Sequence, residues 1–103
     1  MQAIAWEFSD DTTYLDNVER NVASFQTRLA AHHVLDHHDI GFLYSLSAVA
    51  HWKLTDRDEL TPLIVAAAEL LVNRFHDNAG FIQAWGTMND PQEYRLIIDS
   101  LIN

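Results

Sequence analysis

The residues best suited to chemistry form one short run in which two carboxylates flank two imidazoles: Asp36, His37, His38 and Asp39. A long apolar segment, Ile40 to Trp52, follows this run, so the run lies where a helix begins. Free amide hydrogens and the helix dipole stabilise an exposed carboxylate there by about 0.3–1 kcal/mol. One interpretation is therefore that Asp39 or Asp36 simply caps the helix.

The same run could instead bind a metal ion. Neutral imidazoles with carboxylates nearby are ligands of zinc, nickel or iron, and the following four histidines lie close together: His32, His33, His37 and His38. However, no histidine pair spaced four apart lies on one face of a predicted helix, and no distant third ligand stands at a recognisable spacing. A metal site is the weaker interpretation, and we expect no cofactor.

Asp99 is an ionisable residue inside the apolar segment Leu96 to Ile102. Burial of an unpaired carboxylate is costly, so such a residue faces solvent, is paired, or is kept because its protonated form is used. With apolar neighbours on both sides we favour the last interpretation, which makes Asp99 a candidate for acid/base chemistry.

Trp85 stands next to Gly86 in a connecting segment. An aromatic ring beside glycine could form a stacking surface for a sugar or another flat ligand. A tryptophan buried in the core explains the sequence equally well.

These residues belong to a chain of 103 residues, which is long enough for one small domain. Six Lys and Arg against fifteen Asp and Glu give a net charge of -9, which argues against binding to nucleic acid or to an anionic membrane surface. The chain has no cysteine, which excludes a thiolate nucleophile and fits a reducing compartment, so we expect a cytoplasmic protein. No basic export signal and no apolar segment long enough to span a bilayer are visible, so we expect no membrane segment.

Apolar periodicity predicts an all-α fold, because strict alternation and β-branched runs are lacking. Residues 3–8 are expected to end one helix, and 15–29 to form an amphipathic outer helix whose start is signalled by Asp10, Asp11, Thr12 and Thr13. A helix from Asp39 to Trp52 has almost no polar side and should be buried on most sides. Two further helices are expected: one from about Asp56 or Asp58 that contains Pro62 in its first turn and ends at 78–80, and one that opens with Asp90, Pro91 and Glu93.

Outer amphipathic helices alternate with inner apolar ones in this prediction, which is typical of repeated helix hairpins. The last helix would be apolar nearly all round and would end at Asn103 without a capping residue. We therefore expect residues 1–103 to form a single, incomplete segment of such an array.

Three motifs resemble the unsaturated glucuronyl hydrolases of glycoside hydrolase family 88. They are Leu35-Asp36-His37-His38-Asp39-Ile40-Gly41-Phe42-Leu43-Tyr44-Ser45-Leu46-Ser47-Ala48, then Ile82-Gln83-Ala84-Trp85-Gly86, and Arg95-Leu96-Ile97-Ile98-Asp99. The resemblance implies an α/α toroid of six helix hairpins, of which this chain would hold about four helices. It also implies that the chain lacks the first hairpin and most residues of the sugar pocket.

The resemblance further assigns roles by position. Asp99 corresponds to the general acid/base and Asp39 to the second essential carboxylate, while His38 and Trp85 match residues that contact the sugar. The implied reaction is hydration of the C4=C5 bond of an unsaturated uronic acid at the non-reducing end of an oligosaccharide, without metal or cofactor. Because bond cleavage would follow hydration of a vinyl ether and not displacement at the anomeric carbon, the usual rule that links the separation of two carboxylates to the stereochemical outcome does not apply.

Three hypotheses about function follow. The first is a hydrolase in which Asp39 and Asp99 are the catalytic pair, impaired because most of the pocket is missing. The second is an inactive helical remnant that acts as an interaction or structural module, and the third is a histidine-rich metal-binding protein. Inner helices without their partners would expose apolar surface, so we also expect self-association.

Overall fold

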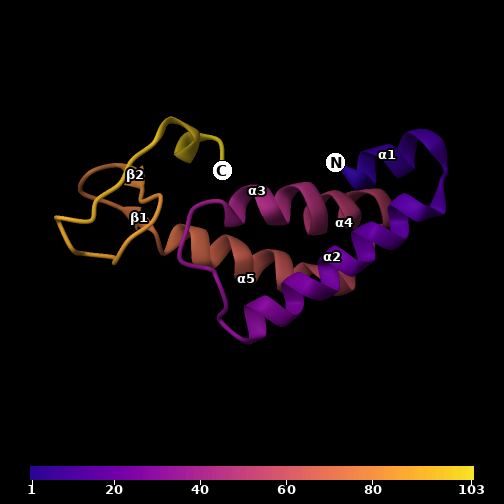
Figure 1. Ribbon diagram of the computed structural model, residues 1–103, viewed down its shortest axis with the longest axis horizontal. Coiled ribbons are helices and arrows are strands. Elements are labelled where there is room, and N and C mark those ends of the chain that lie inside the picture. The colour runs from indigo at the N-terminus through magenta and orange to yellow at the C-terminus, as the bar shows by residue number, and fades with distance from the viewer.

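The computed structural model describes the backbone of residues 1–103 and every side chain except that of Leu101. The chain is mostly helical, which confirms the predicted all-α class (Figure 1). The elements in chain order are α1 (Gln2–Ser9), α2 (Thr12–Ala30), α3 (Ile40–Tyr44), α4 (Ala50–Thr55), α5 (Thr61–Val72), β1 (Phe75–His76) and β2 (Phe81–Ile82).

The first two helices form where the sequence predicted them. Asp11 is the N-cap of α2, and its carboxylate accepts a hydrogen bond of 2.9 Å from the backbone N–H of Thr13. Val18 and Val22 form the buried side of α2. An amphipathic pattern read from the sequence is therefore sufficient to place this outer helix.

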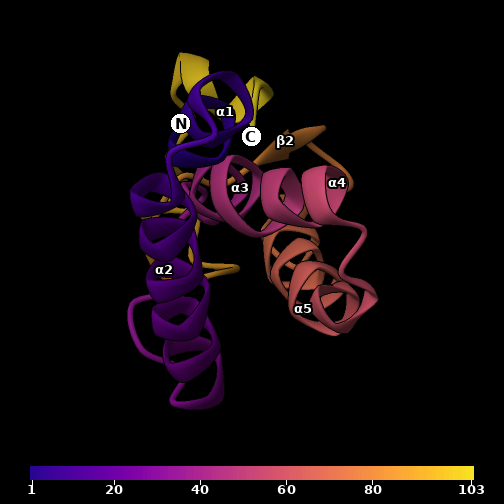
Figure 2. The ribbon, with the colours of Figure 1, turned by 90° about the vertical axis from the view of Figure 1, so that its right-hand side faces the viewer.

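The central helix runs without a break from Ile40 to Thr55, because the π-helical segment Ser45–Val49 joins α3 to α4. It lies between α2 and α5 (Figure 2). The hydroxyl of Ser47, inside the π-helical segment, donates to the carbonyl of Leu43 one turn earlier. A wider turn of this kind changes which side chains face the neighbouring helices.

Tyr44 ties the central helix to α2. Its ring lies 4.8 Å from that of Phe25 between centroids, and its hydroxyl donates a hydrogen bond of 3.2 Å to the Phe25 carbonyl. Tyr44 belongs to a buried core shared by α1, α2, α3 and α5, whose other members include Ala3, Val18, Ile40, Ala48, Leu63 and Ala67. Burial raises the pKa of the Tyr44 phenol, which keeps it a neutral hydrogen-bond donor.

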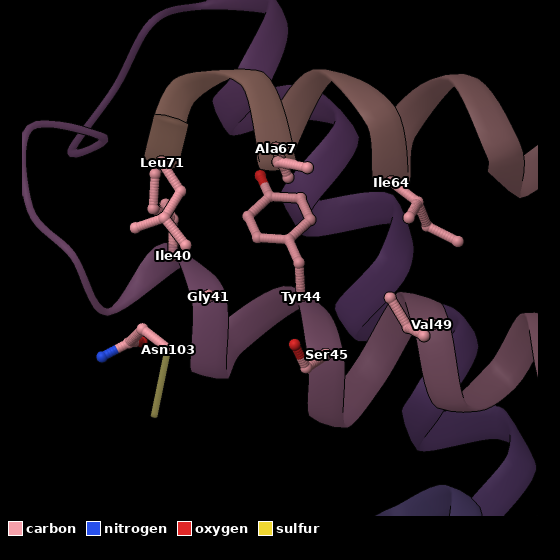
Figure 3. A pocket seen from close by; sticks show the side chains of 10 residues that line it. Ile40, Gly41, Tyr44, Ser45, Val49, Ile64, Ala67, Leu71 and Asn103 are labelled. Carbon is pink, nitrogen blue, oxygen red and sulfur yellow. The ribbon is translucent and has the colours of Figure 1, made fainter. Parts of the chain in front are cut away.

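One side of the central helix is not covered. Leu43 and Leu46 are exposed on it, so the expectation that this helix is buried on most sides is wrong for that side. Among the described residues, the central helix packs against α1, α2 and α5. A small groove of about 110 Å³ also remains between α3 and α5, lined mainly by apolar side chains, with Asn103 at one end (Figure 3).

The helix predicted from Asp56 or Asp58 to residues 78–80, which corresponds to α5, starts later and ends earlier than expected. Thr55 is the last residue of α4, and a 3₁₀ turn, Asp58–Leu60, precedes α5. Pro62 lies in the first turn as predicted, where its missing N–H costs nothing. The helix ends at Val72 because the following residues pair as an antiparallel hairpin, β1 with β2, whose turn contains Gly80 at a φ of 70°.

The helix predicted from Asp90 onward does not form. Asp90 accepts from the backbone N–H of Gln92 in a tight turn, and Glu93 uses its carboxylate to accept from Thr87 instead of completing a capping box. The chain then runs extended because the N–H of Ala84 donates to the Arg95 carbonyl, at 2.7 Å. Only a short 3₁₀ helix, Ile98–Leu101, follows. Backbone pairing with a distant segment therefore overrides the local helix signals.

The whole chain is elongated, with extents of 48 × 27 × 19 Å and a radius of gyration of 15.1 Å. A compact chain of this length would have a radius of about 13 Å. Among the described residues, no helix combines the length and apolarity needed to cross a bilayer.

Candidate active site

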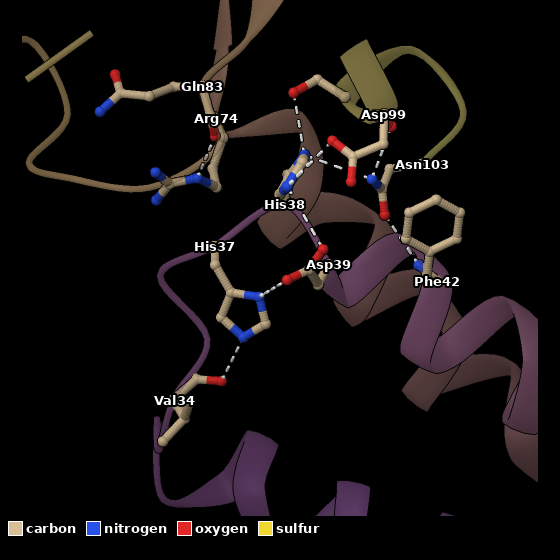
Figure 4. Close-up of polar contacts among 10 residues, drawn as sticks. Val34, His37, His38, Asp39, Phe42, Arg74, Gln83, Asp99 and Asn103 are labelled. Carbon is tan, nitrogen blue, oxygen red and sulfur yellow. Dashed lines mark hydrogen bonds and ion pairs between the residues drawn. The ribbon is translucent and has the colours of Figure 1, made fainter. Parts of the chain in front are cut away.

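His38 lies between the two carboxylates that the sequence singled out (Figure 4). Its Nε2 is 3.4 Å from Oδ1 of Asp39 and 3.8 Å from Oδ1 of Asp99. The imidazole is almost completely buried, whereas the side chains of Asp39 and Asp99 are 53% and 39% exposed. Two carboxylates separated by 60 positions therefore meet at one imidazole and remain open to solvent.

Backbone contacts place these residues together. The N–H of His38 donates a hydrogen bond of 2.9 Å to the carbonyl of Ala84, which fixes the start of the central helix against the segment after β2. Asp99 comes from the 3₁₀ helix Ile98–Leu101. It therefore lies at a helix start near solvent, and the predicted position within an apolar α-helix is wrong.

Asp39 does not act as a capping residue. It occupies the N-cap position of α3 but accepts no capping hydrogen bond, so that interpretation is wrong for the described residues. Its carboxylate instead faces two imidazoles, with Oδ2 at 3.4 Å from Nδ1 of His37 and Oδ1 near His38. The second predicted cap, Asp36, is exposed in the preceding loop. Asp39 is therefore available for chemistry.

Trp85 is 47% exposed, so it is not a core tryptophan. It directly follows Ala84, whose carbonyl accepts the hydrogen bond from the His38 N–H, so its backbone is next to the residue that contacts the site. The exposed indole is available as a stacking surface.

A buried polar pair holds the Trp85 segment in place. Arg74, between α5 and β1, donates through Nε to the Gln83 carbonyl at 2.8 Å and through an η nitrogen to the Gly86 carbonyl at 3.3 Å. The Gln83 side chain is fully buried, and its Nε2 lies within hydrogen-bond distance of the carbonyls of Trp85, Thr87 and Glu93. Its Oε1 lies 2.8 Å from Nε2 of His76. This network fixes both sides of the loop that carries Trp85.

A cavity next to the Trp85 segment is lined by one cation, Arg74, and two carboxylates, Asp36 and Glu93. Burial lowers the pKa of Arg74, and the Asp36 carboxylate opposes that shift. The cavity is open, has a volume of about 610 Å³ and is also lined by Gly86, Thr87 and Met88. Hydrogen bonds from Thr87 hold the pKa of Glu93 below its usual range, so this carboxylate adds negative charge to the cavity.

The metal-binding interpretation finds a different set of residues in the structure. His38, Asp39 and Asp99 each offer one ligand atom, and these atoms lie within 4.8 Å of one another. His32 and His33, which the sequence suggested as ligands, are exposed in the loop after α2 and are not part of this group. Any ion bound here would compete with the acid/base use of the two carboxylates.

Sequence reasoning missed three polar residues that complete the site. Ser100 and Asn103 contact His38 from the other side of its ring, and Arg74 supports the Trp85 segment. Arg74 could have been singled out from the sequence, because it is a lone cation that follows the apolar segment of α5. Ser100 and Asn103 carried none, because their partner is more than 60 positions away in sequence.

Packed helices that hold two partly exposed carboxylates at one buried imidazole define a class of site suited to acid/base chemistry. A scan against models of known protein families finds no match to this chain. Comparisons with individual proteins are specific, and they show that the chain is a homologue of the unsaturated glucuronyl hydrolases. It is 46% identical over 101 residues to the unsaturated glucuronyl hydrolase of Bacillus sp. (strain GL1), which is 97% of this chain and 27% of that protein. It is also 44% identical over 100 residues to an unsaturated chondroitin disaccharide hydrolase of Streptococcus pyogenes serotype M1, with 97% and 25% covered.

Solved structures agree with this relationship. The crystal structure of the unsaturated glucuronyl hydrolase from Streptococcus agalactiae matches with a TM-score of 0.90 and 37% identity, over 99% of this chain and 26% of that one. The Bacillus sp. GL1 enzyme, responsible for the degradation of glycosaminoglycan, matches with a TM-score of 0.90 and 44% identity, over 98% and 27%. The chain therefore spans about a quarter of the length of the relatives that it matches, which confirms the predicted resemblance and toroid fold for that quarter.

Proposed function

We propose that this chain carries the catalytic carboxylate pair of an unsaturated glucuronyl hydrolase and acts on an unsaturated uronic acid at the end of an oligosaccharide. The observation that carries the proposal is the position of His38 between Asp39 and Asp99. Support comes from a solved relative that is an aspartate variant of such an enzyme with dGlcA-Glc-Rha-Glc, 43% identical to this chain.

In the proposed reaction a protonated Asp99 donates its proton to C4 of the substrate, and the C4=C5 double bond is consumed. The resulting Asp99 carboxylate takes a proton from water while the water oxygen bonds to C5. The hemiketal formed at C5 then opens by breaking its bond to the ring oxygen, which gives a ketone at C5 and a hemiacetal at C1. The hemiacetal collapses to an aldehyde, and the remaining saccharide leaves as an alcohol that takes up the hemiacetal proton. Asp39 holds the substrate by hydrogen bonds, and the exposed indole of Trp85 stacks on it.

A hybrid protein tests this proposal directly. Residues 1–103 replace the matching quarter of the Bacillus enzyme, whose fold agrees over 98% of this chain. We expect the hybrid to remove the absorbance of the conjugated alkene in an unsaturated disaccharide. Asp99→Asn should lower this rate by about 100-fold or more, because general acid/base catalysis contributes about 10²–10⁴-fold.

Asp58→Asn is the matched control, since it makes the same chemical change at an exposed position in the turn before α5. It should leave the rate unchanged. The proposal fails if the hybrid has the circular dichroism of the Bacillus enzyme but no hydratase activity, or if Asp99→Asn is as active as Asp58→Asn.

We also propose that this chain associates with a second copy through the uncovered side of its central helix. Leu43 and Leu46 are exposed on that side, and Ile98 near the chain end is 91% exposed. Each copy carries a net charge of -9, so repulsion opposes the contact and salt should weaken that repulsion. Analytical ultracentrifugation should show dimers or larger species whose fraction increases from about 0.01 M to 1 M salt. A monomer at both salt concentrations contradicts this proposal.

A further inference from the structure

We propose that Ser100 and Asn103 are positioning residues that fix the tautomer of His38, so that its Nε2–H points at Asp39 and Asp99. The inference rests on the proposed function for its catalytic meaning, but its structural part can be measured separately. It depends on two contacts to Nδ1 of His38, from Ser100 and Asn103, and on a third that holds Asn103 against the backbone of Asp99 (Figure 4).

Two backbone groups determine the orientation of the Asn103 amide. Its Oδ1 accepts a hydrogen bond of 3.0 Å from the backbone N–H of Phe42, a group that can only donate. Its Nδ2 donates at 3.1 Å to the backbone carbonyl of Asp99, a group that can only accept. The amide oxygen and nitrogen therefore cannot be exchanged without losing both bonds.

The same Nδ2 lies 3.4 Å from Nδ1 of His38. Since Nδ2 carries only donors, Nδ1 must be the unprotonated nitrogen of the ring. Ser100 reaches the same atom, with Oγ at 3.0 Å, and its hydroxyl hydrogen can rotate to donate there. Ser100 and His38 are each 2% exposed, so water does not compete for this contact.

The neutral ring then carries its proton on Nε2, the atom that faces Asp39 and Asp99. In this state the Nε2–H of His38 faces both carboxylates, at 3.4 Å from Asp39 and 3.8 Å from Asp99, and the ring presents no lone pair to a metal ion at that position. It orients the two carboxylates, which is the task of a residue that holds a general acid in place.

Gly41 makes the approach of Asn103 possible. A Cβ at position 41 would lie 2.8 Å from both Cβ and the carbonyl oxygen of Asn103, closer than such atoms can come (Figure 3). A substitution there should displace Asn103 without adding a charge.

Asn103→Asp tests the inference, because it replaces the donor next to Nδ1 by an acceptor of the same shape. Long-range ¹H–¹⁵N spectra of the labelled chain report which imidazole nitrogen carries hydrogen, at about pH 8.5, two units above the usual histidine pKa of about 6.5. The His38 signals are assigned from their loss in His38→Gln. We expect Nε2 to be protonated in the unmodified chain and the proton to move to Nδ1 in Asn103→Asp.

Asn21→Asp makes the same change at an exposed position on α2 and should leave the His38 tautomer unchanged. Gly41→Ala should lower the Nε2-protonated fraction in the same direction as Asn103→Asp, by a smaller amount. The inference is wrong if Nδ1 is protonated in the unmodified chain, or if folded Asn103→Asp and Gly41→Ala both keep the original tautomer.

Activity of the hybrid protein separates this inference from the proposed function. If the proposed function holds, Asn103→Asp in the hybrid should lower kcat with little change in KM, because the pocket that binds the sugar is intact. If the tautomer responds as expected in a folded hybrid without activity, the control of the His38 tautomer by Asn103 is correct and the proposed function is wrong.

Discussion

Gln83 shows how a single buried amide can organise a site without facing it. It has no exposed surface and serves acceptors on three loop residues, Trp85, Thr87 and Glu93. The role of Gln83 could not be predicted from the sequence, because its hydrogen-bond partners come together only when the loop folds back over it. The same holds for Ser100 and Asn103, whereas the carboxylates Asp39 and Asp99 could be predicted from their unusual neighbours.

Gln83→Leu should destabilise the chain by about 2 kcal/mol or more, because each buried group left without a partner costs about 1–3 kcal/mol. The groups at risk are the three loop carbonyls and the His76 ring nitrogen. Urea unfolding measures this change. Gln26→Leu, at an exposed position on α2, is the control and should change stability by less than about 0.5 kcal/mol. Equal urea midpoints for the two variants would show that the network does not stabilise the fold.

At the scale of elements, periodic segments were predictable and the C-terminal part was not. The outer helix α2 and the central helix bury apolar residues at helical spacing, so their sequences suffice to place them. The segment from Asp90 carries equally good helix-start residues, yet it pairs with Ala84 through Arg95 and stays extended. The carbonyls of Arg95 and Glu93, which an α-helix would use, accept instead from Ala84 and from the Gln83 side chain. These contacts override the helix-start residues of the segment.

His51 on α4 should make stability depend on pH. It is 2% exposed, neither ring nitrogen has a partner among the described residues, and burial lowers its pKa below the usual 6.5. The charge of Arg57 lowers the pKa further, while Glu19 and Glu59 oppose the shift. The unfolded chain therefore binds this proton more readily, and the free energy of unfolding should fall as the pH drops below about 6.5.

Urea unfolding at pH 7.5 and at pH 5.5 measures the effect of His51. In His51→Gln the loss of stability between these pH values should be smaller than in the unmodified chain, because the buried titrating group is gone. His33→Gln, in the exposed loop, is the control and should keep the original loss. An identical pH dependence in all three proteins would contradict the assignment to His51.

At the scale of the whole molecule, the incomplete cover of the central helix bears on the activity expected of the isolated chain. It packs against α1, α2 and α5, while Leu43 and Leu46 stay exposed, and the relatives that this chain matches are about four times its length. The carboxylate pair is present, but under the proposed function the described residues would form only part of the wall around the substrate. Positions of the reacting groups then depend on a short 3₁₀ helix, Ile98–Leu101, and on the buried contacts of His38.

The chain by itself should therefore hydrate an unsaturated disaccharide at less than about one hundredth of the rate of the hybrid protein, because a displacement of about 1 Å can cost about 100-fold. Loss of alkene absorbance at equal protein concentration measures both rates. Asp99→Asn in the isolated chain provides the background, and a residual rate that this substitution abolishes would show that the carboxylate pair works without the remaining wall. A rate for the unmodified chain within about tenfold of the hybrid would mean that His38, Asp39 and Asp99 are already held in the reactive geometry, and that the rest of the toroid contributes mainly to binding.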